Sequence, residues 1–420
     1  MRSGAVAVDF SIKARTSALL QARMPGFSLA QPFYNDPGLF QLDLETIFYR
    51  DWLFAGHGCE IPKPGDYVTR QVGDHSAIVV RGADGVIRAF HNTCRHRGSR
   101  LCREEKGNKR KFVCPYHQWA YDLDGRLLAA RHMDDRFDPT RYGLKPVHCE
   151  DVAGFLFICF APVAPDFQPC RDQIAPYMAP HRLDQAKVAH QTTIVEKGNW
   201  KLVWENNREC YHCRGSHPEL CRTWSDEATL NGVNHADTNP EFLTHWARCE
   251  AAGLPSRFLL HESGQYRTAR IPLLRDAESF TMSGQQAVAR PLGGIAEPQI
   301  GSMLLFHYPS SWNHLLRDHA VTFRVTPLGP QETQLTTQWL VHKDAIEGVD
   351  YDLKTLTEVW DATNDEDRRL VEEAQRGINS PAYEPGPYAG AQENGVTQFV
   401  EWYCRSMAER LETMPERQVA

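Results

Sequence analysis

The sequence lacks glycine-rich nucleotide motifs and long apolar runs. Neither a P-loop nor G-x-G-x-x-G occurs in its 420 residues, which argues against a Rossmann-type nicotinamide or flavin site. The longest apolar run begins at Gly154 and is too short to span a bilayer, and the N-terminus lacks the apolar core of a signal peptide. The net charge of −7 argues against a nucleic-acid partner. We therefore expect a cytoplasmic protein that binds neither membrane nor nucleic acid.

The overall composition is that of an ordinary globular protein. Hydrophobic residues make up 42% and charged residues 24%, and the length suffices for two or three domains. The 12 cysteines are scattered along the chain. In a reducing compartment, most of them should be thiols or metal ligands and not disulfides.

Three segments differ in their residue patterns. Residues 1–50 read as an arm with helical pieces. Residues 51–163 are rich in strands, with hairpin turns expected at Ala83–Gly85 and Asp124–Gly125, and end in a buried strand before a Pro-rich stretch. Residues 164–420 mix helices with long antiparallel strands, so we expect an α+β fold.

The last segment contains a predicted strand pair and a long predicted helix. Two strands are expected around Gly329-Pro330. A helical pattern runs from Asp350 to Gln375 and is expected to end at Gly377, a plausible C-cap.

Two short motifs in the strand-rich segment combine cysteine with histidine. Cys94 and His96 form C-x-H, Cys114 and His117 form C-x-x-H, and each pair is predicted at the tip of a hairpin. Two thiolates and two imidazoles suit a structural zinc ion or a Rieske [2Fe–2S] cluster. The even split favours the cluster, since the cysteines can hold one iron and the histidines the other. The neighbouring Gly98, Pro115, Tyr116 and Trp119 also resemble the Rieske loop pattern.

A second group of metal-binding side chains lies in residues 198–220. Glu209, His212 and His217 are spaced E-x-x-H-x-x-x-x-H, and Glu209 and His212 are predicted on one helix face. An ideal helix would point His212 and His217 about 140° apart. Because Pro218 also disfavours helix at His217, we expect the helix to distort or end there.

Two histidines and one carboxylate form the facial triad of mononuclear non-haem Fe(II). The helix after residue 350 offers Asp361, Asp365 and Asp367. Asp367 falls on the apolar, inward face, where a carboxylate needs a partner such as a metal. Asp367 is therefore the first choice for the third ligand and Asp365 the second. Taken alone, His212 and His217 would more often be ordinary core or surface histidines than metal ligands.

The combined motifs resemble the α-subunits of Rieske non-haem iron oxygenases. The stretches that carry the resemblance are "CRHRG…CPYHQW", "NWKLVWENNRECYHCRGSHPEL" and "DRRLVEEAQRG". The likeness is greater to the branch of betaine demethylases, through "HYPSSWNHLLRDH" and "NSPAYEPGPY" among others. In the wider family the position of Glu209 is usually Asp, but this branch is similar in using Glu.

The resemblance implies an all-β Rieske domain beside a Bet v 1-like (helix-grip) catalytic domain. It also implies a homotrimer in which Glu209 bridges a Rieske histidine of one subunit and an iron histidine of its neighbour. The implied activity is oxidative N-demethylation of proline betaine or glycine betaine with O₂, releasing formaldehyde. A separate flavin- or ferredoxin-type NAD(P)H reductase would supply the electrons.

A quaternary ammonium substrate makes no hydrogen bonds, so its recognition should rely on aromatic faces. Candidate pocket residues are Tyr211, Phe306, Tyr308 and Trp312, with His307 as one of several possible partners for a substrate carboxylate. For each aromatic residue, packing in the core is the alternative. Alternative functions are a Rieske electron carrier without catalysis, a ring-hydroxylating oxygenase, and a carnitine- or choline-type oxygenase.

Overall fold

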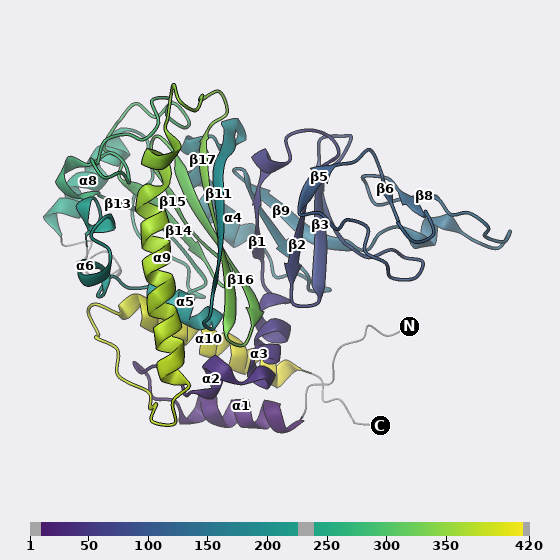
Figure 1. Ribbon diagram of the computed structural model, residues 1–420, viewed down its shortest axis with the longest axis horizontal. Helices are drawn as coiled ribbons and strands as arrows, with labels where there is room; N and C mark the ends of the chain where they lie inside the picture. Colours follow the sequence, from purple (N-terminus) through teal and green to yellow (C-terminus); the bar gives the residue numbers. More distant parts are fainter. Residues whose placement is uncertain (1–9, 226–238, 415–420) are drawn as a thin grey trace.

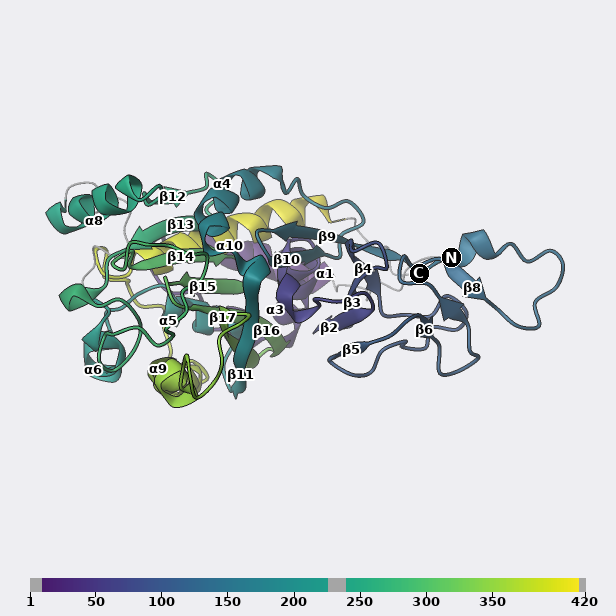
Figure 2. The ribbon, with the colours of Figure 1, turned by 90° about the horizontal axis from the view of Figure 1, so that it is seen from above.

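The computed structural model describes residues 10–225 and 239–414. The chain forms two lobes side by side, each built around a β-sheet, with a layer of helices beneath the second lobe (Figure 1). Seen from above, β6 and β8 lie at one end of the molecule and α6 and α8 at the other (Figure 2). No helix within the described residues is long and apolar enough to cross a bilayer.

The first lobe contains a seven-stranded antiparallel sheet in the order β1-β10-β9-β4-β3-β2-β5. The strands are β1 (Leu53–His57), β2 (Asp66–Val72), β3 (His75–Arg81), β4 (Ile87–His91), β5 (Lys106–Asn108), β9 (Pro146–Val152) and β10 (Phe155–Cys159). The predicted hairpin that turns at Ala83–Gly85 is confirmed as β3–β4, and β10 is buried along its whole length as expected. A small sheet of β6 (Phe112–Val113), β7 (Ala120–Tyr121) and β8 (Leu127–Ala129) extends this lobe, and its β7–β8 turn is the one predicted at Asp124–Gly125.

The second lobe contains another seven-stranded antiparallel sheet, in the order β11-β17-β16-β15-β14-β13-β12. The strands are β11 (Ala186–Glu196), β12 (Leu259–Leu260), β13 (Tyr266–Ile271), β14 (Ser302–His307), β15 (Ser311–Leu315), β16 (Ala320–Gly329) and β17 (Glu332–His342). The two strands predicted around Gly329-Pro330 are confirmed as β16 and β17. Such a strand-and-helix lobe beside an all-β lobe agrees with the predicted α+β fold.

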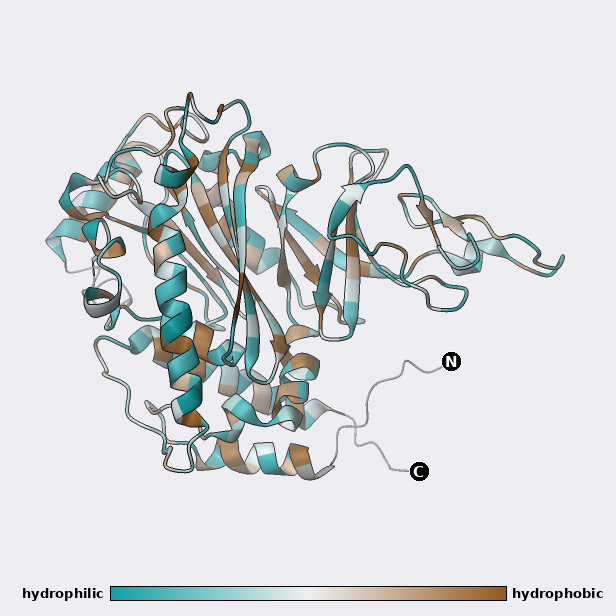
Figure 3. Cartoon of the chain, viewed as in Figure 1, coloured by the Kyte–Doolittle hydropathy of each residue, from teal (hydrophilic) through white to brown (hydrophobic). Residues whose placement is uncertain are grey.

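The helix α9 (Leu353–Ile378) lies across this sheet and turns its hydrophilic face outward (Figure 3). The Asp352 side chain caps its start by accepting a hydrogen bond from the Thr355 backbone N–H at 3.0 Å. The predicted C-cap at Gly377 is wrong, because the helix continues to Ile378. Its C-cap is Asn379, whose right-handed conformation (φ −70°, ψ −12°) needs no glycine.

The remaining helices surround the two sheets. They are α1 (Phe10–Ala22), α2 (Pro32–Asn35), α3 (Pro37–Asp43), α4 (Gln168–Met178), α5 (Trp200–Asn207), α6 (Cys213–Ser216), α8 (Pro240–Ala251) and α10 (Asn394–Thr413). The N-terminal arm, α1 to α3, packs against α10, where Arg23 forms a two-pronged ion pair with Glu401.

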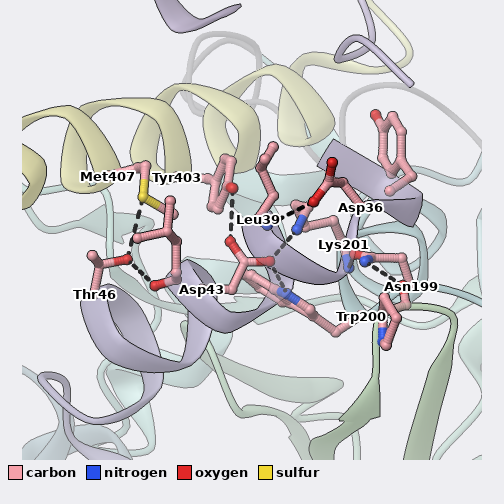
Figure 4. A network of polar contacts seen from close by, with 12 residues as sticks. Asp36, Leu39, Asp43, Thr46, Asn199, Trp200, Lys201, Tyr403 and Met407 are labelled. Atoms are coloured by element: carbon pink, nitrogen blue, oxygen red, sulfur yellow. Dashed lines mark hydrogen bonds and ion pairs between the residues drawn. The ribbon is translucent and has the colours of Figure 1, made fainter. Parts of the chain in front are cut away.

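A buried polar network joins this arm to α5 (Figure 4). The Asp43 carboxylate accepts hydrogen bonds from Trp200 Nε1 at 2.9 Å and Tyr403 O–H at 2.7 Å, and it forms an ion pair with Lys201. Asp43 and Lys201 are fully buried, so each charge depends on the other for its stability. The network anchors α5, which leads directly into the segment with Glu209 and His212.

Candidate functional site

The first group of candidate ligands sits on two loops at the end of the first lobe. Cys94 and His96 follow β4, and Cys114 and His117 form the turn between β6 and β7. The predicted hairpin tip is therefore confirmed for the second pair. It is wrong for the first, because the segment after β4 leads into β5, which pairs with β2 on the far side of the sheet.

The four side chains converge with the sulfurs inside and the imidazoles outside. Cys94 and Cys114 are buried, and the His96 and His117 rings lie side by side with their centroids 4.6 Å apart. Burial raises the pKa of the Cys94 thiol, and the adjacent Cys114 sulfur raises it further against a hydrogen bond from Tyr121. Two buried sulfurs in contact become stable thiolates once metal ions neutralise them, so this donor set fits a metal centre.

Neighbouring side chains fix these loops. The His96 ring stacks on the Trp119 indole at 4.8 Å, and the Tyr121 hydroxyl lies 3.2 Å from Cys94 Sγ while accepting a hydrogen bond from the Arg95 backbone N–H. Gly98 adopts a left-handed conformation (φ +78°) in the turn that returns to Cys94. The imidazoles are thereby held near the surface of the lobe.

The second group of candidate ligands lies at the other end of the molecule. The helix α5 ends at Asn207, and Glu209 and His212 lie in the turn before α6. The prediction that they share a helix face is wrong, although the turn still brings them together. The prediction that the helix ends near His217 is confirmed, since α6 stops at Ser216 and His217 is non-helical (φ −123°, ψ 69°).

Three ligand atoms meet here at nearly equal distances. His212 Nε2 and His217 Nε2 are 3.0 Å apart, and Asp367 Oδ1 lies 3.3 and 3.0 Å from them. Ligands at right angles on bonds of about 2.1 Å would be about 3 Å apart, which is the geometry of one triangular face of an octahedron. Asp367 Oδ1 is buried and no hydrogen bond satisfies it. A cation at the centre of the triangle would satisfy it.

The helix α9 separates the three candidate aspartates. Asp367 faces the two histidines, whereas Asp365 pairs with Arg368 at 2.5 Å and with Arg369 on the same helix. Asp361 lies nearly two turns before Asp367. Asp367 is thus the aspartate of this set that meets the histidines.

Each histidine is held from behind by a glutamate. Glu209 Oε1 lies 2.5 Å from His212 Nδ1, and Glu366 Oε2 lies 2.8 Å from His217 Nδ1. These contacts place the ring proton on Nδ1 and leave the Nε2 lone pair for a metal. Glu366 was not foreseen from the sequence, where its only signal was its place beside Asp367.

The charges of this site favour a cation. Burial opposes charging of His212, but the carboxylates of Asp367 and Glu209 outweigh it and raise its pKa to about 10. The pKa of His217 is raised by Asp367 and Glu366 against the same effect of burial. A positive charge between these rings is therefore stabilised, and a metal ion can supply it in place of protons.

A disulfide lies beside this site. Cys213 Sγ is near the ligand nitrogens of His212 and His217, but it is bonded to Cys210 Sγ and so offers no thiolate. Within the described residues, Cys210 and Cys213 form the disulfide that the structure contains, which confirms that most of the 12 cysteines are not in disulfides.

A cavity of about 80 Å³ opens beside the three ligand atoms. Four aromatic side chains are among those that line it: Trp224, Phe306, Trp312 and Trp360. Trp224 was not foreseen. Trp360 shares the inward face of α9 with Asp367, and this helical periodicity is the sequence signal that points to it.

The other candidate pocket residues lie away from this cavity. The Tyr211 side chain is 65% exposed, His307 stacks on Tyr266, and Tyr308 packs against Trp204 in the core. Phe306 lines the cavity, whereas His307, the next residue of β14, is not among the residues that line it. Within the described residues, the structure brings together Phe306 and Trp312 of the predicted set.

Comparison with known proteins places both lobes in characterised families. The family model described as "Ring hydroxylating alpha subunit (catalytic domain)" matches residues 183–409, and "Rieske [2Fe-2S] domain" matches residues 51–147. The glycine betaine monooxygenase oxygenase subunit of Pseudomonas aeruginosa (strain UCBPP-PA14) is 50% identical over 94% of this chain and 92% of its own. The corresponding subunit of Chromohalobacter salexigens is 48% identical over 94% and 89%.

Solved structures agree on the fold. A quaternary ammonium Rieske monooxygenase, described in connection with carnitine oxidation by gut microbiota and inter-subunit electron transfer, superposes with a TM-score of 0.70 at 22% identity. The superposition covers 93% of this chain and 98% of that monooxygenase chain.

Proposed function

This chain belongs to the Rieske non-haem iron oxygenase α-subunits, and we propose that it N-demethylates a small quaternary ammonium betaine. The reaction would use O₂ and reductase-supplied electrons, hydroxylate an N-methyl group and release formaldehyde as the hydroxylated product collapses. Glycine betaine is the first candidate substrate, because two relatives that align over nearly the whole chain bear its name. Proline betaine is the second.

The observation that carries this proposal is the small aromatic cavity beside His212, His217 and Asp367. A volume of about 80 Å³ holds roughly five to eight water-sized groups, which suits a molecule as small as glycine betaine better than a polycyclic arene. Trp312 and Trp360 are aromatic residues of the cavity wall and suit a quaternary ammonium, which cannot be hydrogen-bonded. These features favour a betaine over the substrate of a ring-hydroxylating enzyme.

We assign the residues to the family's two cofactors, a Rieske [2Fe–2S] cluster and a mononuclear iron. Cys94 and Cys114 would hold one cluster iron and His96 and His117 the other, within a Rieske domain over residues 51–163. His212, His217 and Asp367 would hold the mononuclear Fe(II) in a catalytic domain over residues 164–420. The arm of residues 1–50 would support the catalytic domain through Asp43.

When bound, these groups supply one-electron transfer and activation of O₂. The side chains of the chain position the reaction around them. Glu209 and Glu366 fix the orientation of the two imidazoles through their Nδ1 atoms. The aromatic walls would exclude water and hold one N-methyl group toward the site.

We also propose that electrons pass between subunits of a homotrimer. The strand β6, which precedes Cys114, and the helix α6, which follows His212, lie at opposite ends of the molecule (Figures 1 and 2), so one chain does not bring its own two centres together. Glu209, with its side chain 12% exposed, would connect His212 to a cluster histidine of a neighbour. A separate NAD(P)H reductase, in the cytoplasm, would reduce the cluster, since the sequence has no nucleotide motif of its own.

The test is release of formaldehyde by the purified trimer with a surrogate reductase, O₂ and NADH. Glycine betaine, proline betaine, carnitine and choline are compared, with naphthalene as the arene control. We expect stoichiometric formaldehyde with glycine betaine or proline betaine. Oxygen consumption without formaldehyde from any betaine would contradict the proposal, and dihydroxylated naphthalene would support the ring-hydroxylating alternative.

A further inference from the structure

Arg208 forms part of the cavity wall, next to Glu209 in the chain. The residue is only 4% exposed. Its Nε donates a hydrogen bond to the Tyr308 hydroxyl at 2.8 Å, and its guanidinium lies 4.2 Å from the centroid of the Phe306 ring. A buried arginine is thus fixed in one orientation at the edge of the cavity.

The guanidinium of Arg208 has hydrogen-bonding capacity left over. Within residues 10–225 and 239–414, Nε is the nitrogen of Arg208 that donates a side-chain hydrogen bond, and Nη2 is buried without a partner. A buried, unsatisfied donor on a charged group is costly. A carboxylate against this guanidinium would supply charge-assisted hydrogen bonds, for which the guanidinium geometry is suited.

The charges around the cavity also favour binding of an anionic group. The carboxylates in its wall are Glu209, which is bonded to the His212 imidazole, and Asp367, whose Oδ1 faces the cation site. A second guanidinium, that of Arg267, lies 5.1 Å from the same Phe306 ring. With a ferrous ion at the His212–His217–Asp367 site, positive charges in the wall outnumber negative ones. A purely cationic ligand would be repelled there, whereas a zwitterion brings its own counter-charge.

We propose that Arg208, held by Tyr308 against the Phe306 ring, binds the carboxylate of the substrate and selects zwitterionic betaines over cations that lack a carboxylate. The inference rests on the proposed function for the identity of the substrate. A carboxylate bound at Arg208 leaves the trimethylammonium end for the tryptophan faces. The cavity would then bind both the carboxylate and the trimethylammonium group of the zwitterion.

The test measures binding without turnover, by calorimetry on the anaerobic holoenzyme without reductase. Three ligands separate the two ends: glycine betaine, choline (the cation without the carboxylate) and 3,3-dimethylbutyrate (the carboxylate without the cation). In the wild type we expect glycine betaine to bind about 10- to 100-fold more tightly than choline, the range of a charge-assisted hydrogen bond. Arg208→Gln should abolish this preference and the binding of dimethylbutyrate, and Arg208→Lys should restore part of both.

Two further variants serve as controls for the role assigned to Arg208. Arg270→Gln removes a buried arginine of the same strand as Arg267 that does not line the cavity, and it should keep the preference. Tyr308→Phe removes only the hydroxyl that holds Nε and should weaken glycine betaine several-fold without changing choline. If Arg208→Gln fails to fold, Tyr308→Phe and dimethylbutyrate binding to the wild type decide the question.

Equal affinity of the wild type for choline and glycine betaine would overturn the inference. So would an unchanged preference in an Arg208→Gln protein that retains its cluster absorbance. The binding result is independent of turnover. Absence of formaldehyde would therefore refute the proposed demethylase activity. The carboxylate-binding role of Arg208 would still be tested by the measured affinities.

Discussion

The two candidate metal centres differ in how their ligands are supported. At the first, Cys94 and Cys114 are buried while the imidazoles lie near the surface, and buried His117 Nδ1 makes no hydrogen bond to the described residues. At the second, each imidazole has a glutamate behind it. The first arrangement exposes histidines for contact with another molecule, and the second fixes histidines around a cavity. This difference is the one expected between an electron carrier and a site of bond chemistry.

The largest expected effects come from removing one ligand at each centre. Cys94→Ser should abolish the visible absorption of the cluster and leave the mononuclear site, whereas Asp367→Ala should keep the absorption and lower total iron by about one third. Both variants should lose formaldehyde release. Iron analysis and visible spectroscopy on the same samples give the two readouts.

The matched control is Asp365→Ala, which removes a neighbouring aspartate that pairs with Arg368 and Arg369. It should retain iron and activity. Loss of iron from Asp365→Ala but not from Asp367→Ala would exchange the roles assigned to the two residues.

The next effect separates the two glutamates of the second centre. Glu209→Ala should keep both metals at saturating Fe(II) but reduce turnover by about 100-fold or more, because it removes the proposed link to the neighbouring cluster. Glu366→Ala should weaken iron binding by about 10- to 100-fold and recover its turnover when iron is added. Rapid-mixing measurement of cluster oxidation in a single turnover distinguishes them.

Glu366→Ala is the appropriate control because it removes an equivalent contact to an imidazole, on His217. Normal single-turnover electron transfer in Glu209→Ala would refute the bridging role. Equal loss of electron transfer in both variants would mean that the glutamates act only by orienting the imidazoles.

Some features of the two centres can be predicted from the sequence and others cannot. A metal-binding motif can be predicted from the pairs Cys94/His96 and Cys114/His117, because the two residues of each pair are close in sequence. The end of the helix before His217 follows from Pro218. The face of α9 also favoured Asp367 over Asp365, since helical periodicity reports which side is buried. In each case the deciding information lies within a few residues.

The parts that sequence did not predict depend on distant contacts. Glu366 supports His217 across 149 residues of sequence, and nothing local distinguishes it from the other acids of α9. The sequence predicts Tyr308 as a pocket residue, but in the structure it contacts Trp204 and Arg208 in the core. Which face of β14 meets the cavity depends on how the sheet is covered, and period-two alternation alone does not specify it.

A third prediction extends the comparison to pH. Burial raises the pKa of Glu205, on the helix leading to the second centre, to about 7, although hydrogen bonds from Tyr34 and Tyr388 oppose it. The folded protein then holds a proton that the unfolded chain releases near its ordinary value. The stability from this group is therefore complete below about pH 4.5 and is lost as pH rises through 7.

Glu205→Gln should remove this dependence. The difference in unfolding free energy between wild type and variant should fall by up to about 3 kcal/mol from pH 4.5 to 7.5, as measured by urea denaturation. Glu401→Gln, at the partly exposed Arg23 ion pair, serves as the matched control substitution. A constant difference between wild type and Glu205→Gln would show that Glu205 is ionised throughout this range.

The smallest effect is expected at the first centre, where one hydroxyl contacts one sulfur. Tyr121→Phe removes the hydroxyl that lies 3.2 Å from Cys94 Sγ. Hydrogen bonds to the sulfurs of a cluster stabilise its reduced, more negative state, so their loss lowers the reduction potential. A hydrogen bond of about 1 kcal/mol corresponds to about 40 mV for one electron. Redox titration of the cluster should show that decrease, while Tyr116→Phe, which alters an exposed ring beside His117, should leave the potential unchanged.

If Tyr121→Phe also leaves the potential unchanged, the Tyr121 hydroxyl holds the Arg95 backbone and does not tune the cluster. The two centres would then be alike, because in both the neighbouring side chains would serve only to position the ligands.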